Sequence, residues 1–399
     1  MRSSKLFLTG LFIVMMFAGC APKGAKPLSI EDTPPNHYLR GMELIEEGKA
    51  SEAGSRFARA LELDPQYAPG FAGMGLVVAM GVESQPDAKH REIELEKYQD
   101  LLDTAYDKAR TSEDKFIVTV TAVRAETAAK DAKWIKAADK WYDKGLVIKK
   151  IDEGFLPYYR NIEALDYFMG KAWFEAGEYT KAKDLLGKVV GKDVGKWHQA
   201  ANALYTRVQK IERAIANYTV TNVSKAIAAK EQVSRADVAA LMVSELNLDK
   251  LFAGRLNTKP LPEASFIPAD VVDHPFKVEI VDVLKWNIRG LEPVYDEITK
   301  AELFKPANPV SRKEMALALE DVLIKVSGDE TLANKYFGQE SSPYEDVKPT
   351  EAYYNAVVNA VSRNLMETNL SGAFRPNDDL DGAELLLAVV RLRNAVNVY

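Results

Sequence analysis

Cysteine and histidine are scarce in this chain of 399 residues, which has one cysteine and four histidines. A lone cysteine cannot form an intramolecular disulfide, so no disulfide framework supports the fold. The histidines lie far apart in the sequence, and no H-E-x-x-H pair, glycine-rich phosphate loop or G-x-S-x-G turn occurs. We therefore predict no catalytic residues, no metal site, no cofactor and no enzyme activity. The histidines are His37, His90, His198 and His274.

An excess of positive charge is also missing, because 52 lysines and arginines are outnumbered by 58 aspartates and glutamates, which gives a net charge of -6. Proteins that bind nucleic acids without sequence preference need many cations for the phosphates. We therefore predict no nucleic-acid partner. The composition, 47% hydrophobic and 28% charged, is that of a globular protein long enough for two or three cores.

Long apolar runs are absent beyond the amino terminus, where residues 6–18 follow Arg2 and Lys5. This run is shorter than the roughly 20 residues of a membrane-spanning helix and suits the core of a signal peptide. It ends in Phe-Ala-Gly-Cys at residues 17–20, which resembles the lipobox of bacterial lipoproteins. The resemblance implies removal of residues 1–19, diacylglycerol on the Cys20 sulfur and usually a further acyl chain, such as palmitate. Ordinary signal cleavage, with Cys20 left as a thiol, is the alternative.

Residues 20–35 are rich in proline, lysine and glycine, which predicts a lipidated tether that reaches about 50 Å from the lipid. Ala21 follows the cysteine, where enterobacterial lipoproteins retained at the inner membrane carry an aspartate. We therefore expect a lipid-anchored protein of the cell envelope, at the outer membrane and facing the periplasm.

Residues 36–217 contain two segments with the same internal spacing, 129 residues apart. The spacing predicts a helix hairpin in which Gly41 and Gly170 allow close approach of a neighbouring helix, while Gly48 and Gly177 occupy the turn. Phe57 lies on the predicted buried face of the second helix. The first segment comprises Gly41, Gly48, Ala53, Phe57 and Ala60, and the second Gly170, Gly177, Ala182, Leu186 and Val189.

This hairpin pattern resembles the tetratricopeptide repeat, whose unit is about 34 residues. The match is good over residues 34–67 and 163–196 and degenerate between them, where further helices are predicted over 97–109, 113–129 and 134–149. The resemblance implies an all-α fold with a helical-hairpin solenoid. Its concave face would bind a protein or peptide, and a role as a mere spacer is the alternative.

Residues 218–399 carry a second repeated pattern, with units expected over 218–250, 266–326 and 343–396. The last two units contain Phe-x-Pro loops 70 residues apart but begin at an offset of 76, which places a six-residue deletion in the third unit's loop. The first copy lacks a convincing Phe-x-Pro, with Ile227 and Ala229 in its place.

Three helix starts in this region have the layout of a capping box, in which a hydroxyl or carboxylate accepts from the helix start and an acid reaches back. Ser234 with Asp237 and Ser311 with Glu314 have this spacing. Residues 381–384, Asp-Gly-Ala-Glu, follow it as well. Capping alone explains these residues without a ligand.

The three units resemble the S-layer homology (SLH) domain, through Tyr-Glu-Asp-Val at 344–347, Phe-Arg-Pro at 374–376 and two Val-Ser-Arg turns. The resemblance implies an α-helical SLH-like repeat module that attaches without a covalent bond to peptidoglycan or its linked wall polysaccharide, through grooves between units. In this family the turn arginine contacts anionic groups of the glycan.

Arg235 and Arg312 are the turn arginines of the first two units, and the third has Gly382. A cation in the first turn opposes the helix dipole by about 0.3–1 kcal/mol, so its repetition indicates a use, with a solvated surface arginine as the alternative. The candidate glycan-binding residues are Arg235, Arg312, Ser234, Ser311, Asp237, Glu314, Trp286 and Arg375.

The leading hypothesis is a structural lipoprotein that links a membrane to the wall through the SLH-like units and binds partners through the hairpins. The alternative is an assembly factor for an outer-membrane complex, similar to the tetratricopeptide lipoproteins that act as pilotins or in barrel assembly. A glycan-processing enzyme, the third hypothesis, has no visible paired-carboxylate motif.

Overall fold

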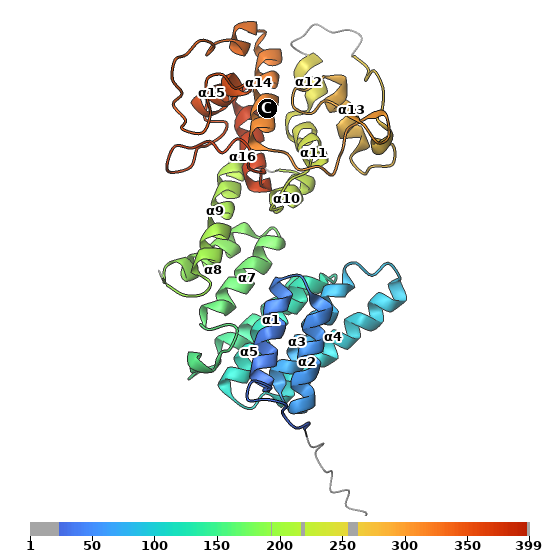
Figure 1. Cartoon of the computed structure of the whole chain (residues 1–399), viewed down its shortest axis with the longest axis vertical. Helices are drawn as coiled ribbons and strands as arrows, with labels where there is room; N and C mark the ends of the chain where they lie inside the picture. Colours follow the sequence, from blue (N-terminus) through green and yellow to red (C-terminus); the bar gives the residue numbers. More distant parts are fainter. Residues whose placement is uncertain (1–23, 193, 217–219, 254–261, 397–399) are drawn as a thin grey trace, which may run out of the picture. The chain divides into compact units, whose positions relative to one another are not determined.

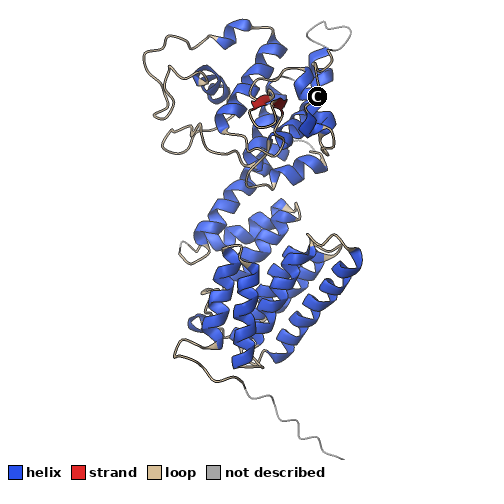
Figure 2. Ribbon diagram, turned by 45° about the vertical axis from the view of Figure 1, so that its right-hand side comes forward, coloured by secondary structure: helices blue, strands red, loops and turns tan. Residues whose placement is uncertain are grey.

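The computed structural model describes residues 24–192, 194–216, 220–253 and 262–396, so the predicted leader and Cys20 lie outside it. Helices dominate these ranges, with sixteen α-helices and one pair of short strands (Figures 1 and 2). The predicted all-α class is therefore confirmed at this level. The chain forms two compact units, the first from residues up to 132 with 144–159 and the second from 133–143 with 160 onward.

The amino-terminal unit is built from five helices joined by short turns. Successive helices pack as antiparallel neighbours, and α3 contacts both α4 and α5. The five are α1 (Pro34–Glu46), α2 (Ala50–Leu63), α3 (Ala68–Val82), α4 (Ala88–Lys108) and α5 (Ser112–Ala129).

The predicted role of Phe57 and the glycines in the first hairpin is confirmed. Phe57 is fully buried, and a Cβ on Gly41 would lie 2.4 Å from its ring. A Cβ on Gly73 of α3 would lie 2.6 Å from the same ring, so both glycines leave room for it. Gly48 has a φ of +73° in the turn between α1 and α2, a conformation that favours glycine.

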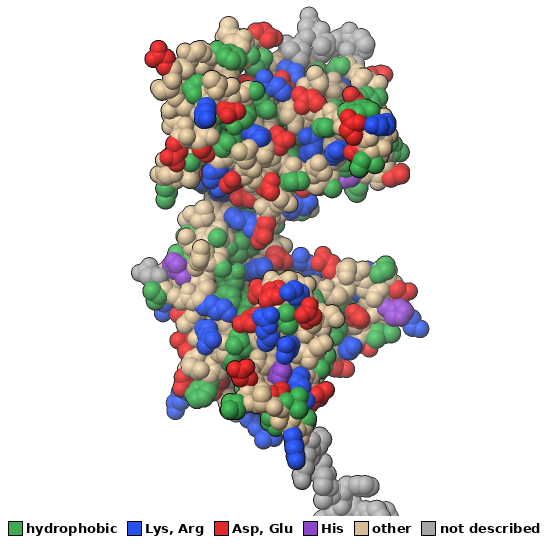
Figure 3. Space-filling view, in the orientation of Figure 1, with side chains coloured by type: hydrophobic (Ala, Val, Ile, Leu, Met, Phe, Trp, Pro, Cys, Tyr) green, Lys and Arg blue, Asp and Glu red, His purple; other side chains and the backbone are tan. Residues whose placement is uncertain are grey.

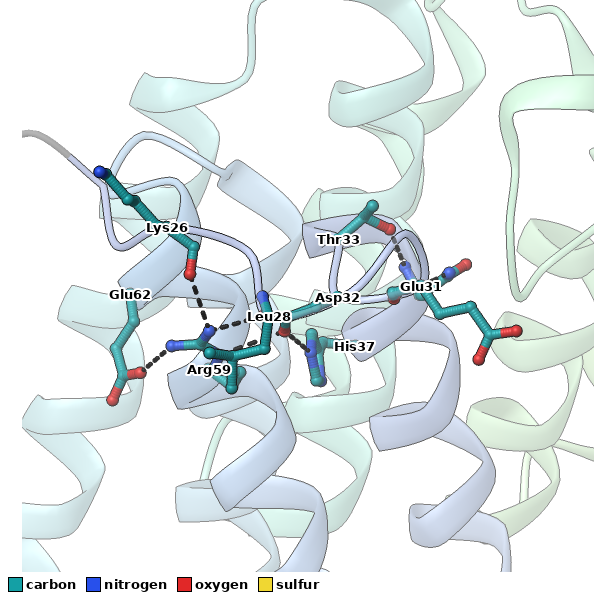
Figure 4. A network of polar contacts seen from close by, with 9 residues as sticks. Lys26, Leu28, Glu31, Asp32, Thr33, His37, Arg59 and Glu62 are labelled. Carbon is teal, nitrogen blue, oxygen red and sulfur yellow. Dashed lines mark hydrogen bonds and ion pairs between the residues drawn. The ribbon is translucent and has the colours of Figure 1, made fainter.

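The end of the predicted tether is packed against α1 and α2, which corrects the expectation of a free segment up to residue 35 (Figure 4). The Asp32 carboxylate accepts hydrogen bonds from Arg59 Nη2 (2.6 Å), His37 Nε2 (2.7 Å) and the Leu28 amide (2.6 Å). The Arg59 guanidinium holds the pKa of Asp32 well below its usual range. The carboxylate binds three groups from separate elements, and this fixes the segment.

A second set of helices repeats the hairpin in the carboxy-terminal unit. Gly170 of α7 allows the Leu186 side chain of α8 to approach, and Gly177 has a φ of +75° in the turn. The helix α9 packs on α8 and also on α16, so no boundary between compact units falls at 217/218. The helices of this set are α6 (Trp134–Leu146), most of which belongs to this unit, α7 (Glu163–Glu175), α8 (Tyr179–Val190) and α9 (His198–Ile215). The 3-10 helix η1 (Glu153–Phe155) belongs to the amino-terminal unit.

The remaining elements form three repeats within the carboxy-terminal unit, with α16 in contact with both α11 and α14. The first contains α10 (Asn222–Ala228), α11 (Arg235–Leu246) and α12 (Leu248–Ala253). The second contains η2 (Ala269–Val271), α13 (Lys277–Lys285), β1 (Val294–Asp296), β2 (Ala301–Leu303) and α14 (Arg312–Ser327). The third contains η3 (Glu330–Ala333), α15 (Tyr354–Ser362) and α16 (Gly382–Ala395).

The antiparallel hairpin of β1 and β2, in which Val294 pairs with Leu303, accounts for the longer loop of the second repeat. The corresponding loop of the third repeat, residues 363–373, contains no strand. The predicted length difference between these loops is therefore confirmed. Among the residues that the structure describes, no helix combines the length and the apolar character needed to cross a membrane.

Candidate functional site

The helices α11, α14 and α16 each begin with a side-chain cap, as predicted. Ser234 Oγ accepts from the Asp237 amide at 3.2 Å, and the Asp237 carboxylate accepts from the Ser234 amide at 2.9 Å. The Ser311 amide donates to Glu314 Oε2 at 2.7 Å. At the third helix, Asp381 Oδ1 accepts from the amide of the residue three positions later, at 2.7 Å.

The three turns that precede these helices are joined in a closed cycle of backbone hydrogen bonds. The Val233 amide donates to the Leu380 carbonyl (3.0 Å), the Leu380 amide to the Val310 carbonyl (2.9 Å), and the Val310 amide to the Val233 carbonyl (3.2 Å). All three side chains are buried. We call this cycle the three-turn ring. It creates three junctions, between the first and second repeats, the second and third, and the third and first.

The Phe-x-Pro loops are held by the aspartate that begins each of the last two repeats. Asp346 accepts from the amides of Phe374 (2.9 Å) and Arg375 (2.5 Å). Asp270 binds the equivalent two amides of the second repeat in the same way. Arg375 has a φ of +58°, and its partly exposed side chain pairs with Asp378 at 3.3 Å.

Arg235 points into the first junction and is only 7% exposed. Its three nitrogens donate to backbone carbonyls, with Nε on Phe304 at 2.8 Å and Nη2 on Glu292 at 2.7 Å. The guanidinium also lies 4.8 Å from the centre of the Phe304 ring, a cation–π contact. Burial lowers the pKa of Arg235.

Arg312 repeats this arrangement at the second junction and is 1% exposed. Nε donates to the Phe374 carbonyl at 2.7 Å, Nη2 donates to the Glu367 carbonyl at 2.7 Å, and Nη1 pairs with the Glu384 carboxylate. Burial lowers the pKa of Arg312 to about 10.

These positions correct the prediction that both arginines reach out to a glycan. Their side chains turn inward because each finds a set of loop carbonyls on the next repeat. At the third junction Gly382 takes the arginine's place, because a Cβ there would lie 1.8 Å from the Ile227 carbonyl oxygen. The arginines hold the junctions together and leave little surface for a ligand.

Trp286 also lies in the core, 5% exposed, with its ring centre 4.9 Å from that of Phe252. Its Nε1 donates to Asp249 at 2.7 Å. The prediction of a glycan contact at Trp286 therefore has no support from its position, since its ring is buried and its Nε1 donates within the module.

A groove of about 480 Å³ opens at the first junction, beside the Ser234 cap. Its three walls come from the turn before α11, the chain before α13 and the Phe-x-Pro loop of the second repeat. It is lined by Lys230, Gln232, Val233, Ser234, Ala236, Asp237, His274, Pro275, Phe276, Pro306, Ala307 and Pro309.

The groove combines apolar faces with a few polar groups. Lys230 Nζ donates to the Asp237 carboxylate at 2.7 Å, and the Lys230 side chain is 47% exposed while that of Asp237 is 3% exposed. His274 Nδ1 accepts from the Phe276 amide at 3.0 Å, which fixes the ring beside the prolines. Rings with apolar faces, an ammonium, an amide and a hydroxyl suit a sugar chain that carries an anionic group.

Among the aligned positions at which the second junction differs from the first, two bear directly on the space beside the arginine. Lys313 stands where the first repeat has Ala236, and Asn377 stands where the second repeat has Ala307. Lys313 Nζ donates to Asn377 Oδ1 at 2.8 Å and lies 5.6 Å from the centre of the Tyr353 ring. A long side chain therefore occupies the space that two alanines leave open at the first junction.

Ser234 and Asp237, two of the predicted glycan-binding residues, lie in this groove, whereas Lys230, His274 and Phe276 were not predicted. These three lie outside the residues shared by the repeats, so self-comparison gave them no weight. The sequence does contain one signal for Lys230, because a lysine four residues before the Ser234 cap is close enough to pair with the acid of that capping box, Asp237.

No cluster of histidine, cysteine or acidic side chains arranged to hold a metal ion occurs within the described ranges. On the face drawn in Figure 3, blue and red side chains are interspersed, without a large area of one sign.

Residues 343–386 match the S-layer homology domain family, so the third repeat contains an SLH domain. Such a domain implies anchoring to the cell wall or envelope, and SLH domains typically bind secondary cell-wall polymers associated with peptidoglycan. Comparison with curated proteins and with solved structures finds no match for the chain.

Proposed function

We propose that this protein is a non-enzymatic cell-envelope lipoprotein that links a membrane to peptidoglycan or a wall glycan. The SLH match at residues 343–386 supports the wall end of this link. We propose the groove at the first junction as the glycan-binding site, and the presence of this groove is the main support for the proposed function. The three-turn ring closes the first repeat onto the last, so a groove outside the matched residues belongs to the same module.

The groove supports a glycan ligand through the chemistry of its walls. Phe276 and its neighbouring proline offer apolar faces for the faces of sugar rings. The exposed Gln232 side chain offers its amide oxygen as an acceptor, because its Nε2 already donates to Asp379. Lys230 would pair with an acidic group of the glycan, because its side chain is half exposed at the rim and an ammonium has three donors, of which one serves Asp237.

The membrane end of the link rests on the lipobox-like run that ends at Cys20. We propose acylation of this cysteine, which with more than one acyl chain gives stable attachment. Ala21 after the cysteine supports the outer membrane, with the protein facing the periplasm. The helix hairpins of α1 with α2 and of α7 with α8 would supply surfaces for a protein partner.

Co-sedimentation of the mature chain with purified sacculi tests the wall end. Ala236→Lys should lose at least about tenfold in binding, because the new side chain would lie across the groove as Lys313 does at the second junction. Lys230→Gln should also weaken binding, while Lys250→Gln is a matched control on the exposed surface of the same repeat. Circular dichroism checks that each variant is folded.

Equal sedimentation of the Ala236→Lys, Lys230→Gln and parent chains would contradict a glycan site in this groove. Failure of the parent chain to sediment, together with its recovery in a membrane complex, would favour the assembly-factor alternative.

A further inference from the structure

The segment that precedes α1 is held rigidly although it presents large apolar side chains to solvent. Leu28 is 87% exposed and Ile30 is 97% exposed. The Leu28 amide donates a hydrogen bond to the Asp32 carboxylate, and this carboxylate also pairs with Arg59 on α2 (Figure 4). Two large apolar side chains that are exposed together on a fixed segment mark a candidate contact surface.

The chain is already fixed against α2 several residues before Leu28. The Ala25 amide donates to the Glu62 carbonyl at 2.6 Å. A Cβ on Gly24 would lie 1.9 Å from the Leu63 carbonyl oxygen, so the backbone passes directly over the end of α2. The chain is therefore packed against α2 from Gly24 and Ala25 onward, and this part of it does not act as a free tether.

This position sets the distance between the lipid and the amino-terminal unit. Cys20 lies five residues before Ala25, and an extended chain covers at most ~3.6 Å per residue, so the two are at most ~18 Å apart. An acylated Cys20 would therefore hold this end of the unit against the membrane surface, far closer than a free tether would.

We propose that Leu28 and Ile30 insert into the bilayer that carries the Cys20 acyl chains, so that the lipid anchor and these side chains together form one membrane-contact surface. This inference rests on the acylation in the proposed function. Exposed Lys26 and Glu31 beside them have opposite charges, so the contact is apolar and needs no anionic lipid.

The test uses the acylated full-length protein in uncharged phosphatidylcholine vesicles, with an environment-sensitive fluorophore on one added cysteine. Ile30→Cys is the probe, and Ser84→Cys is the matched control, an exposed residue just beyond the far end of α3. The fluorophore at residue 30 should emit at shorter wavelength than the control. A nitroxide lipid should quench it more strongly, and the difference should persist at high salt.

The parent chain serves as the internal check, because a thioether at Cys20 takes up no thiol-reactive fluorophore. A label at residue 30 that behaves like the control on an acylated chain would overturn the membrane contact and leave the anchor intact. A parent chain that reacts at Cys20 and does not remain with vesicles would overturn the proposed anchor, and the membrane contact with it.

Discussion

The first and second junctions of the carboxy-terminal module share one set of hydrogen bonds and differ in the space beside it. In both, a turn arginine binds the carbonyl of the phenylalanine in the next Phe-x-Pro loop, at 2.8 and 2.7 Å. Beside Arg235 the alanines leave a groove, whereas beside Arg312 a lysine spans to Asn377. The residues that hold the repeats together are therefore distinct from those that decide whether a ligand can enter.

Removing the arginine of the second junction should lower the stability of the protein more than any other change considered below. Arg312→Ala should destabilise the protein by about 3–5 kcal/mol, because it leaves the buried Glu384 carboxylate without its cation. Arg235→Ala should cost less, roughly 1–3 kcal/mol, since its partners are carbonyls. Urea unfolding measures both, with exposed Arg375→Ala as the control. Equal losses at the two junctions would break the distinction between them.

The third junction should tolerate no side chain where the others carry arginine. Gly382→Ala should destabilise the protein by roughly 1–3 kcal/mol, because its methyl group would collide with the Ile227 carbonyl. Gly54→Ala on α2 is a matched control, since its Cβ would lie 3.6 Å from Val77 and should raise stability by roughly 0.5–1 kcal/mol. A stabilised Gly382→Ala variant in thermal melts would contradict the close approach.

Removing Lys313 should open the second junction. Lys313→Ala removes the side chain that lies between Asn377 and Tyr353, and should create a second groove like the first. Saturation binding of soluble wall fragments should then show up to about twice as many sites per chain. A chain with Lys313→Ala and Ala236→Lys together separates the sites, because its binding would depend on the new groove alone.

The smallest effect concerns the amino-terminal segment and depends on pH. The pKa of the Asp32 carboxyl is lowered in the folded protein. Its contribution to the stability of the folded segment is therefore fully present above its pKa in the unfolded chain, near 3.8, and is lost as the pH falls toward its pKa in the folded protein. Asp32→Asn should reduce hydrogen-exchange protection of residues 26–33 at neutral pH, and the difference should narrow below about pH 4. A difference that does not vary with pH would exclude the charge as its cause.

Much of the fold followed from local patterns in the sequence. The Ser234 and Ser311 caps need only residues three positions apart, and the pairing of Gly41 with Phe57 needs only one hairpin. The direction of Arg235 could not be predicted in this way, because its partner carbonyls lie 55 to 69 residues later on another repeat. The fixed segment before α1 was missed for a related reason, since Asp32 pairs with Arg59 outside any periodic pattern.

The three-turn ring also limits how such a module can evolve. In an open stack of repeats each unit contacts only its neighbours, so copies can be added or removed at the ends. Here the amide of Val233 closes onto the carbonyl of Leu380, and the first copy already occupies the place that a fourth would need. Copy number is therefore set by closure at three, and a gene that lengthened this region would have to add a whole further ring.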